Sequence, residues 1–414
     1  MIRSVLVVSP EPPYPLHGGG AFRVASLLQY FARFAEVDLV LFSESGQPAT
    51  LPPGLVRSQT VIPLPVHSTN PAARYLRNAR RAWQGVPPLV DRLSGQSRAL
   101  SHLLSGRHYD LGVVEHFWCA PYFDQISAVC AETALDLHNV ESMLHQRCAQ
   151  TSQGLVSLGH ARFAHCSRQM EAALLPRYSL VLTPSENDAA LARKIAPAAR
   201  VAVYPNAIPD VPAPAPNVSE SDKAPVVVFS GNFEYHPNID AVRFLVSSIW
   251  PRVHKLCPEL RLRLVGRGDK FVRPLLPSAL NIEVTGPVDD ALAEIAAARI
   301  VIAPLRTGSG TRIKILQAWA TARPVIATPL AAEGLEYAEG RDLLIANDGA
   351  AIAAAIATLN VDPTRRARLA AGGRRVFEAR YTWPAAWRSL DSSPLFSGTS
   401  TGQSYTEDSN ANSR

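Results

Sequence analysis

A candidate anion-binding loop lies in the C-terminal half of the sequence, between two apolar runs that are predicted to be strands. The loop contains Gly308-Ser309-Gly310-Thr311, and apolar residues recur at helical spacing directly after it, from Ile313 to Ala320. A glycine turn that leads into a helix brings unpaired backbone N–H groups and the positive end of the helix dipole to one place. Three cations surround the loop, namely Arg306, Arg312 and Lys314. This stretch is therefore predicted to bind a phosphorylated ligand.

A second glycine loop of the same kind lies near the N-terminus. Gly18-Gly19-Gly20 follows an apolar run at residues 2–8 and precedes a helical pattern that carries Val24, Leu27 and Phe31. Three glycines before a helix allow a backbone or a ligand to approach closely. The alternative is a flexible loop that binds nothing.

Two histidines directly follow predicted strands. His116 comes after the run Leu111–Val114, and His138 comes after Ala134–Leu137. In open α/β sheets, ligands bind beyond the carboxyl ends of the strands, so both histidines lie where chemistry is expected. A structural role is the alternative for each of them.

The elements that position these residues alternate between strand and helix in both halves of the chain. A Pro-, Ser- and charge-rich break at residues 209–225 separates the halves and has the composition of a linker. Within the N-terminal half, a Pro-rich stretch runs to Pro65, and one long helix is expected from about 141 to 176. This alternation predicts an α/β fold of two Rossmann-like, doubly wound domains that face each other across a cleft.

The expected domain limits follow from the same reading. They are an N-terminal domain at 1–208, the linker at 209–225, a C-terminal domain at 226–380, a segment at 381–391 that packs back toward the N-terminal domain, and a disordered tail at 392–414. The tail is rich in Ser, Thr, Gly and Asn and offers no core candidates.

Composition limits the class of protein. The 414 residues, 47% hydrophobic and 18% charged, suffice for two globular domains, and no apolar run reaches the roughly 18 residues that a membrane-spanning helix needs. The five cysteines are scattered without CxxC spacing, which predicts reduced thiols in a cytoplasmic protein and argues against a zinc site. The short apolar run at the N-terminus is expected to be a buried strand rather than a signal peptide.

Positive charge is concentrated in one part of the N-terminal half. The net charge is only +6, but the segment from Arg74 to Arg107 holds seven arginines and a single acid, Asp91. Together with Tyr75 and Trp83, this composition predicts a peripheral contact with an anionic membrane, at the inner face of the cytoplasmic membrane. A solvated helix with an ordinary buried face is the alternative. Nucleic acid is not expected as a partner, because no binding motif or stacking array accompanies the charge.

The motifs, taken together and in order, resemble the GT-B glycosyltransferases, and within them the retaining family 4, also called glycosyl transferases group 1. The resemblance covers about residues 3 to 390. In the C-terminal half it rests on VVFSGNFEYHPNIDAVRFL, LRLVGRGD, IEVTGPVDD, VIAPLRTGSGTRIKILQAWATARPVIATPLAAEGL and YTWPAAW. In the N-terminal half it rests on PEPPYPLHGGGAFRVASLL, EHFWCAP, DLHNVES, LTPSENDA and VYPNAI.

This resemblance implies a bacterial-type hexosyltransferase of the kind found in polysaccharide biosynthesis. Such an enzyme uses a nucleotide-diphosphate sugar as co-substrate, retains the anomeric configuration, and needs neither a metal ion nor another cofactor. The acceptor is a hydroxyl of a polysaccharide, a lipid-linked glycan or a small molecule. The leaving phosphate is expected to help take the acceptor proton, so that transfer occurs on one face of the sugar.

The resemblance also implies that the N-terminal domain at 1–208 binds the acceptor and that the C-terminal domain at 226–380 binds the donor, and it implies the site residues. His116 is the expected catalytic residue, beside the donor sugar. The expected donor-binding residues are Gly19, Gly20, Gly231, Asn232, Gly266, Gly286, Val288, Arg306, Ser309, Gly310, Thr311, Arg312, Lys314 and Gln317. Those expected on the acceptor side or in the cleft are Arg23, His138, Asn139 and Glu141, and none is expected to bind a metal.

The sequence departs from the family pattern where two glutamates are usual. Ser309 stands at the first of these positions and Gln317 at the second, so both carboxylates are missing. A glutamine can still accept a hydrogen bond from a ribose hydroxyl, without charge assistance, at a loss of about 1 kcal/mol or more. One alternative is therefore a GT-B pseudoenzyme that binds a nucleotide or a partner without turnover. A nucleotide-sugar epimerase is a further alternative.

Overall fold

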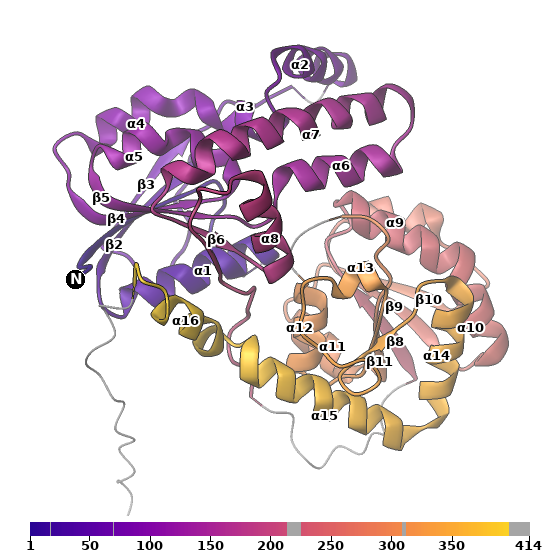
Figure 1. Cartoon of the computed structure of the whole chain (residues 1–414). Helices are drawn as coiled ribbons and strands as arrows, with labels where there is room; N and C mark the ends of the chain where they lie inside the picture. The colour runs from indigo at the N-terminus through magenta and orange to yellow at the C-terminus, as the bar shows by residue number, and fades with distance from the viewer. Residues whose placement is uncertain (17, 69, 213–224, 309–311, 397–414) are drawn as a thin grey trace, which may run out of the picture.

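The protein folds into two α/β domains, each built on one parallel sheet (Figure 1). The computed structural model describes residues 1–16, 18–68, 70–212, 225–308 and 312–396. The N-terminal sheet has the strand order β3-β2-β1-β4-β5-β6-β7, and the C-terminal sheet has the order β10-β9-β8-β11-β12-β13. In each sheet the first strand, β1 or β8, lies in the interior. The next two strands follow on one side of it and the remaining strands on the other side, which is the doubly wound arrangement. The predicted fold class is therefore confirmed.

The strands of the N-terminal sheet are β1 (Ser4–Ser9), β2 (Glu36–Ser43), β3 (Ser58–Pro63), β4 (Tyr109–Glu115), β5 (Cys130–Asp136), β6 (Leu180–Thr183) and β7 (Val201–Val203). Those of the C-terminal sheet are β8 (Val226–Ser230), β9 (Arg261–Val265), β10 (Ile282–Gly286), β11 (Ile300–Ala303), β12 (Val325–Ala327) and β13 (Leu344–Ile345). Most central strands are apolar throughout and buried, because helices cover both faces of each sheet.

The helices of the N-terminal domain are α1 (Gly19–Ala32), α2 (Pro71–Gln84), α3 (Pro88–Leu93), α4 (Ser97–Leu104), α5 (Phe123–Ser127), α6 (Glu141–Thr151), α7 (Gly154–Leu174) and α8 (Glu186–Ile195). The rest are α9 (His236–Phe244), α10 (Trp250–Leu256), α11 (Ala291–Ala297), α12 (Ile313–Ala320), α13 (Pro329–Ala332), α14 (Gly349–Val361), α15 (Pro363–Arg380) and α16 (Trp383–Asp391). The helical stretch expected over 141–176 is present and consists of two packed helices, α6 and α7, with a break before Gly154, whose φ is 59°.

One strand at the edge of each sheet differs from the sequence-based prediction. β3 lies inside the stretch that was expected to be Pro-rich and irregular, and it pairs with β2 from Asp38–Ser58 to Ser43–Pro63. An edge strand tolerates proline and polar residues because one side makes no ladder hydrogen bonds. β13 is only two residues long and pairs with β12.

The chain returns from the C-terminal domain to the N-terminal one through α16, which lies beside α1 in Figure 1. Tyr30 Oη donates to Asp391 Oδ1 at 2.9 Å, and Trp387 Nε1 donates to Ser26 Oγ at 3.0 Å. Phe396 is fully buried and packs edge-on against Tyr30. The expectation that the chain lacks core residues from 392 onward is therefore wrong for 392–396, and the remainder of that segment, 397–414, lies outside the described residues.

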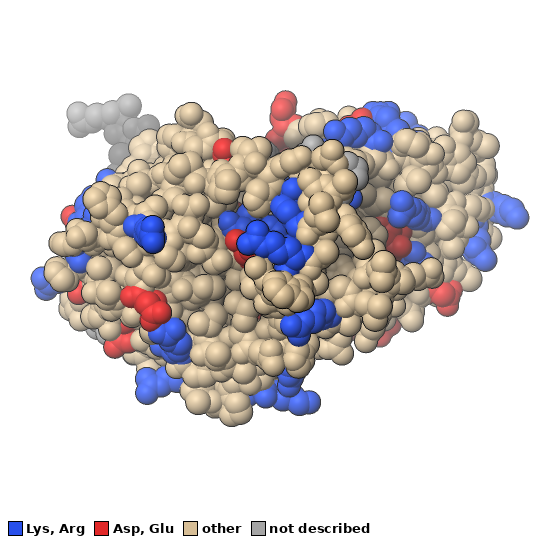
Figure 2. All heavy atoms as spheres, turned by 90° about the horizontal axis from the view of Figure 1, so that it is seen from above, with Lys and Arg blue, Asp and Glu red and all other residues tan. Residues whose placement is uncertain are grey.

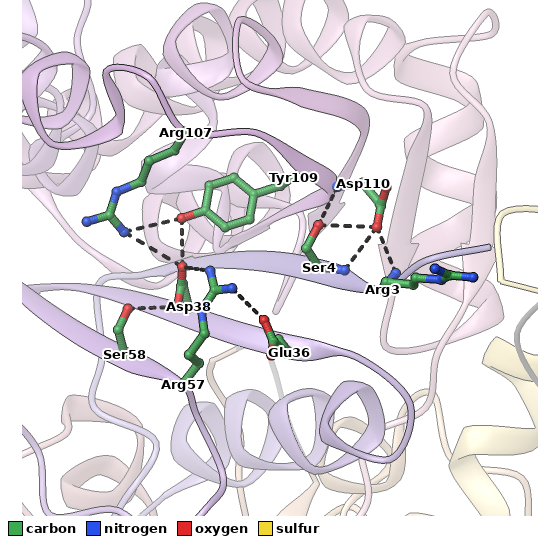
Figure 3. Close-up of polar contacts among 9 residues, drawn as sticks. All are labelled: Arg3, Ser4, Glu36, Asp38, Arg57, Ser58, Arg107, Tyr109 and Asp110. Carbon is green, nitrogen blue, oxygen red and sulfur yellow. Dashed lines mark hydrogen bonds and ion pairs between the residues drawn. The ribbon is translucent and has the colours of Figure 1, made fainter.

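A polar network closes the N-terminal sheet at the edge where β1, β2 and β4 begin (Figure 3). Asp38 accepts hydrogen bonds from Tyr109 Oη at 2.8 Å and Ser58 Oγ at 2.7 Å, and it also pairs with Arg57. Asp110 likewise accepts from the backbone N–H of Ser4 at 3.0 Å. Side chains thus cover this end of the sheet. The opposite end, at the carboxyl ends of the strands, is where a ligand is expected to bind.

Candidate functional site

The first half of the candidate site lies where β1 and β4 end, at the point where the strand order of the N-terminal sheet reverses. Gly18 caps α1 with φ 102° and without a side-chain hydrogen bond. No acidic residue lies within the first turn of α1 itself. The backbone N–H groups of Gly19 and Gly20 therefore begin a helix whose positive end attracts anionic groups.

His116 stands at the end of β4 with an unusual backbone conformation, φ 65° and ψ 142°. Its ring is stacked between Trp118 and His138, with centroids 4.2 Å and 3.4 Å away. The side chain is buried, and its Nε2 atom has no hydrogen-bond partner among the described residues. Strained backbone and an unpartnered buried nitrogen are costly for stability, and such features gather at functional sites. The structure therefore places His116 where the sequence predicted a reactive residue.

Glu11 faces His116 across the mouth of the glycine loop. Its Oε2 atom lies 3.6 Å from His116 Nε2, and its backbone is fixed by Ser9, whose Oγ donates to Glu11 O at 2.7 Å. A Cβ on Gly20 would lie 2.0 Å from Oε2, so the carboxylate rests directly on this glycine. Burial would raise the pKa of Glu11, but the hydrogen bond and the charge interaction with His116 outweigh it and lower this pKa to about 2. Glu11 thus remains an anion at the N-terminus of α1.

Behind His116 lies a buried group of charged side chains that includes Arg23. Arg23 donates to both carboxylate oxygens of Asp136 at 2.6 Å, to Tyr204 O at 2.8 Å and to Asn206 Oδ1 at 2.9 Å. It is only 2% exposed. Arg23, which was expected on the acceptor side or in the cleft, therefore lies inside the domain: a guanidinium needs several acceptors when it is buried, and this one connects strand ends.

His138 also points into the domain rather than into the cleft. Its Nε2 atom lies 2.9 Å from Glu115 Oε2 and 3.6 Å from Asp136 Oδ2. Burial and the charge of His116 lower the pKa of His138 well below its usual value, so the ring is neutral. Burial raises the pKa of Glu115 to about 7. His138 therefore supports the ring of His116, and its expected place on the acceptor side or in the cleft stays a prediction.

The ligand atoms of Glu115, Asp136 and His138 lie within 4.8 Å of one another, a spacing that could suit a cation. Arg23 already supplies a positive charge to this group and occupies both oxygens of Asp136. We therefore assign these residues to the support of His116.

Asn139 and Glu141, the other two residues expected on the acceptor side, lie at the start of α6. Glu141 is buried, accepts a hydrogen bond from Trp118 Nε1 at 3.1 Å, and is also bonded by the side chain of Asn139. Burial raises the pKa of Glu141. Glu141 thus fixes Trp118, which in turn stacks on His116, while Asn139 is half-buried.

The second half of the candidate site lies at the ends of β8 and β9 in the C-terminal domain. Gly266 has φ 138°, and a Cβ there would lie 2.0 Å from Gly231 O, so these two loops can touch only because Gly266 is a glycine. Gly231 in turn faces the Nζ atom of Lys314, which a Cβ on Gly231 would approach to 2.6 Å. Asn232 O accepts from Asn238 Nδ2 at 2.7 Å and so fixes the same loop.

The remaining predicted donor residues surround this loop pair. Gly286, with φ 74°, ends β10 and accepts a hydrogen bond from Gly266 N at 3.2 Å. Val288 is partly buried against the core. Gln317 lies half-buried on α12. Ser309, Gly310 and Thr311 lie outside the described residues.

The three predicted cations differ in what they contact. Arg306 is bidentate to Asp240 at 3.2 and 2.8 Å, and Arg312 donates to Glu333 O at 2.8 Å and Glu333 Oε2 at 3.0 Å. Lys314 has no acidic partner among the residues that the structure describes, and burial lowers its pKa to about 8. Lys314 is therefore the cation that is best placed to meet an incoming anion.

The two domains meet at a cavity of about 210 Å³. Glu333 lies in its wall and joins the domains, because it accepts from Arg147 of α6 at 2.8 and 2.7 Å and from Arg312 of the C-terminal domain. The other polar lining residues are Ser185, Asn187, Asp188, Asn206 and Tyr381. A polar cavity between two strand-end loops is where a ligand can contact both domains.

Glu11, Glu115, Asp136 and Glu333 are the site residues that the sequence-based prediction missed. Glu115 directly precedes His116, and Asp136 lies two residues before His138. Both acids therefore lie at predicted strand ends, and this position could have identified them. Glu11 and Glu333 carried no such signal, because their partners are far away in the sequence.

Comparison with known proteins agrees with this architecture. Residues 224–362 match the family described as Glycosyl transferases group 1. The structure is similar to sucrose-phosphate synthase from Thermosynechococcus elongatus, with a TM-score of 0.72, 17% identity, and coverage of 96% of this chain and 98% of that chain. It is also similar to HepE from Anabaena in complex with UDP, with a TM-score of 0.60, 15% identity, and coverage of 94% and 98%. The GT-B fold of the protein is thereby confirmed.

A curated relative is an uncharacterized 44.6 kDa protein in the cps region of Klebsiella pneumoniae. It is 28% identical over 130 residues, which are 30% of this chain and 34% of that protein. The match therefore spans about a third of the relative's length.

Proposed function

We propose that the protein transfers a hexose from a nucleotide-diphosphate sugar to a hydroxyl acceptor, with retention of configuration and without a metal ion or another cofactor. The observation that carries this proposal is the position of Lys314, a half-buried cation without an acidic partner in the described part of the chain, held against Gly231 at the end of β8. The C-terminal domain that holds it matches a glycosyltransferase family. A structural neighbour, HepE, was solved in complex with UDP.

The chemistry of the proposed reaction sets what the site must do. When the glycosidic bond to the diphosphate breaks, negative charge develops on the leaving group, and fixed cations and helix N-termini stabilise that charge. Lys314 and the start of α12 lie on the donor side, and the start of α1 lies on the opposite side of the cleft. These groups supply positive charge without a metal ion.

His116 lies beside the proposed position of the donor sugar. Its Nε2–H can donate to a sugar hydroxyl, and the rings of Trp118 and His138 hold it in place for that purpose. We propose same-face transfer, in which an oxygen of the departing diphosphate takes the acceptor proton as the new glycosidic bond forms. No carboxylate nucleophile on the protein is needed in this scheme, in contrast to the retaining glycosidases.

The acceptor is a polysaccharide, a lipid-linked glycan or a small molecule, in the cleft on the side of the N-terminal domain. The cavity beside Arg147 and Asn206 offers hydrogen-bond donors and acceptors for the hydroxyls of the acceptor.

We also propose that the protein is cytoplasmic and peripheral at the inner face of the membrane, with all five cysteines as thiols. No helix in the described ranges has the length and the apolar character that crossing a bilayer requires.

A pseudoenzyme that binds a nucleotide without turnover is the second candidate, because Gln317 replaces the usual ribose-binding glutamate. The substitution Gln317→Glu separates the two. In a transferase it should raise donor affinity about fivefold, since a charged acceptor strengthens the hydrogen bond to a ribose hydroxyl by about 1 kcal/mol. Turnover should persist in both forms. Nucleotide binding with no sugar transfer or donor hydrolysis in either form would favour the pseudoenzyme.

A further inference from the structure

Helix α2 is turned with its apolar stripe toward the solvent. Ala72, Tyr75, Leu76, Ala79 and Trp83 follow the spacing of one helical face, and all five are exposed. Tyr75 is 62% exposed, Leu76 68% and Trp83 83%. A surface helix normally buries this stripe against the core. Here the opposite face packs inward.

The inward face of α2 is held by polar contacts. Arg81 is buried and donates to Asp91 Oδ2 at 2.7 Å, and Arg162 of α7 donates to Ala82 O at 3.2 Å. Asn70 caps the N-terminus, with Oδ1 accepting from Ala72 N at 2.9 Å, and Gly85 ends the helix with φ 71°. Since both ends are capped, α2 is a preformed helix whose outward apolar face is a stable feature of the fold.

A second exposed apolar segment lies at the N-terminal end of α7, the helix that α2 contacts. Leu155 is 71% exposed, Val156 61% and Leu158 67%. This segment lies within about 10 Å along the axis of α7 from Arg162, where α2 packs, since each residue adds 1.5 Å. In Figure 1, both α2 and this end of α7 lie on the upper side of the molecule.

Positive charge accompanies the apolar surface. Helix α2 contains Arg74, Arg77, Arg80 and Arg81 and no acidic residue. Figure 2 views the molecule from the side on which α2 lies and shows Lys and Arg side chains at several places on this face, with acidic side chains beside those near its middle. Apolar and aromatic side chains flanked by arginines, without acids, match the chemistry of an anionic bilayer surface, because a helix can lie in the interface with its rings among the headgroups.

Only part of the basic region that the sequence indicated between Arg74 and Arg107 lies on the exposed face of α2. Arg92 pairs with Glu44, and Arg107 lies at the sealed strand edge of Figure 3, 3.7 Å from Asp38. These two arginines are therefore separate from the exposed face of α2. The arginines of α2 are therefore the ones that accompany its exposed apolar stripe.

We propose that the exposed stripe of α2 and the N-terminal end of α7 form a membrane-docking surface that inserts into the headgroup region of an anionic bilayer. Trp83, Tyr75 and Leu76 enter the interface together with Leu155 and Val156, and Arg74 and Arg80 bind the lipid phosphates. This docking does not depend on the transferase activity proposed above. It would bring the cleft, which begins at the carboxyl ends of the same N-terminal sheet, close to an acceptor in the membrane.

The test is co-sedimentation of the full-length chain with vesicles of phosphatidylcholine alone and with vesicles of phosphatidylcholine and phosphatidylglycerol in equal amounts. We expect binding to the anionic vesicles and a shift of tryptophan emission to shorter wavelength, because Trp83 is highly exposed in the free protein. The double variant Leu76→Ser/Trp83→Ser should bind at least tenfold more weakly. Its control, Phe271→Ser/Val361→Ser, removes exposed apolar residues from the C-terminal domain and should bind as the wild type does.

A second pair of variants tests the charges. Arg74→Gln/Arg80→Gln should weaken binding to the anionic vesicles about thirtyfold, since each arginine near such a surface is worth about 1 kcal/mol. The control Arg261→Gln/Arg368→Gln should change it little. Equal partitioning of the wild type onto both vesicle types would overturn the proposal, as would α2 variants that bind like their controls. If the wild type binds neither kind of vesicle but forms dimers through α2, then a second copy of the chain covers the apolar stripe, and the proposal is overturned. Because no nucleotide sugar is present, a failure here leaves the transferase proposal intact.

Discussion

Glu11 and His116 face each other at the N-terminus of α1, with Oε2 of the carboxylate 3.6 Å from Nε2 of the imidazole. Three sides of the histidine are fixed, by Trp118, by His138 and by its own strained backbone, and Glu11 lies on the fourth. In the proposed reaction, the donor sugar meets His116 at the edge that Glu11 now faces.

The substitution Glu11→Gln tests this pair. It keeps the size of the side chain and removes the charge that orients His116, so we expect kcat to fall about tenfold with little change in KM for the donor. Because Glu11 does not contact the nucleotide side of the cleft, binding of the free nucleoside diphosphate should stay within twofold of wild type. A kcat equal to that of the wild type would show that Glu11 does not position His116.

Gly20→Ala should separate folding from function at the same place. The new Cβ would lie 2.0 Å from Oε2 of Glu11, so the carboxylate must move away from His116. Alanine is the better helix former by up to about 1 kcal/mol, so the melting temperature should stay level or rise. Donor turnover should fall at least tenfold. The matched control is Gly159→Ala in α7, which has open space around it and should leave turnover unchanged. Full activity in Gly20→Ala would contradict the proposed approach of the sugar to this loop.

Lys314→Met should weaken diphosphate binding by tenfold or more and leave binding of the nucleoside unchanged, because only the phosphates need the cation. Isothermal titration with both ligands measures the difference. Arg306→Gln is the control, and we expect less than threefold change because Arg306 is already paired with Asp240. With a pKa of about 8 for Lys314, diphosphate affinity of the wild type should decline as the pH rises from 7 to 9. Equal losses in both variants would contradict the special role of Lys314.

Lys314 should also lower the free energy of unfolding of the protein without ligand. Its pKa is lowered from 10.5 to about 8 on folding, so below pH 8 the folded state carries the full penalty of a buried charge. We expect Lys314→Met to raise the free energy of unfolding at pH 7 by about 1 to 3 kcal/mol, and this gain should shrink as the pH rises from 8 toward 10. Urea unfolding at both ends of that range measures the effect. A destabilised variant would mean that Lys314 contributes to packing instead.

Glu115 should make the stability of the N-terminal domain depend on pH. Its pKa of about 7 lies above the value of 4.5 that it has when unfolded, so between these values the folded state binds more protons. The stability that Glu115 contributes is therefore present at pH 5 and is lost as the pH rises through 7. We expect the unfolding free energy of wild type, relative to Glu115→Gln, to fall by about 3 kcal/mol between pH 5 and pH 8. A constant difference across this range would show that Glu115 stays ionised.

Much of the fold follows from the sequence because the strands are short apolar runs with glycine, proline or polar residues at their ends. Val226–Ser230 and Ile300–Ala303 are buried on both faces and stand out in the sequence for that reason. β3 escaped notice because an edge strand is half-exposed and polar. The break between α6 and α7 escaped notice because apolar residues occur on both sides of it and no proline marks it.

The site was predictable in part. His116 was found because a strand end positions it, and that signal is local. The partners of Arg23 and His138, which are Asp136 and Glu115, could not be predicted. They lie 113 and 23 residues away, and sequence spacing does not show which strand-end groups pair with each other. Local patterns thus locate a site, and packing decides which of its residues meet the ligand.

The most direct test of the account is the release of nucleoside diphosphate from a panel of nucleotide sugars, without acceptor, by the wild type and by Lys314→Met. We predict that the wild type slowly hydrolyses one of these donors and that Lys314→Met, which should remain folded by circular dichroism, loses at least nine-tenths of that rate. If the folded wild type neither hydrolyses nor is thermally stabilised by any donor in the panel, the protein is not a nucleotide-sugar-dependent transferase.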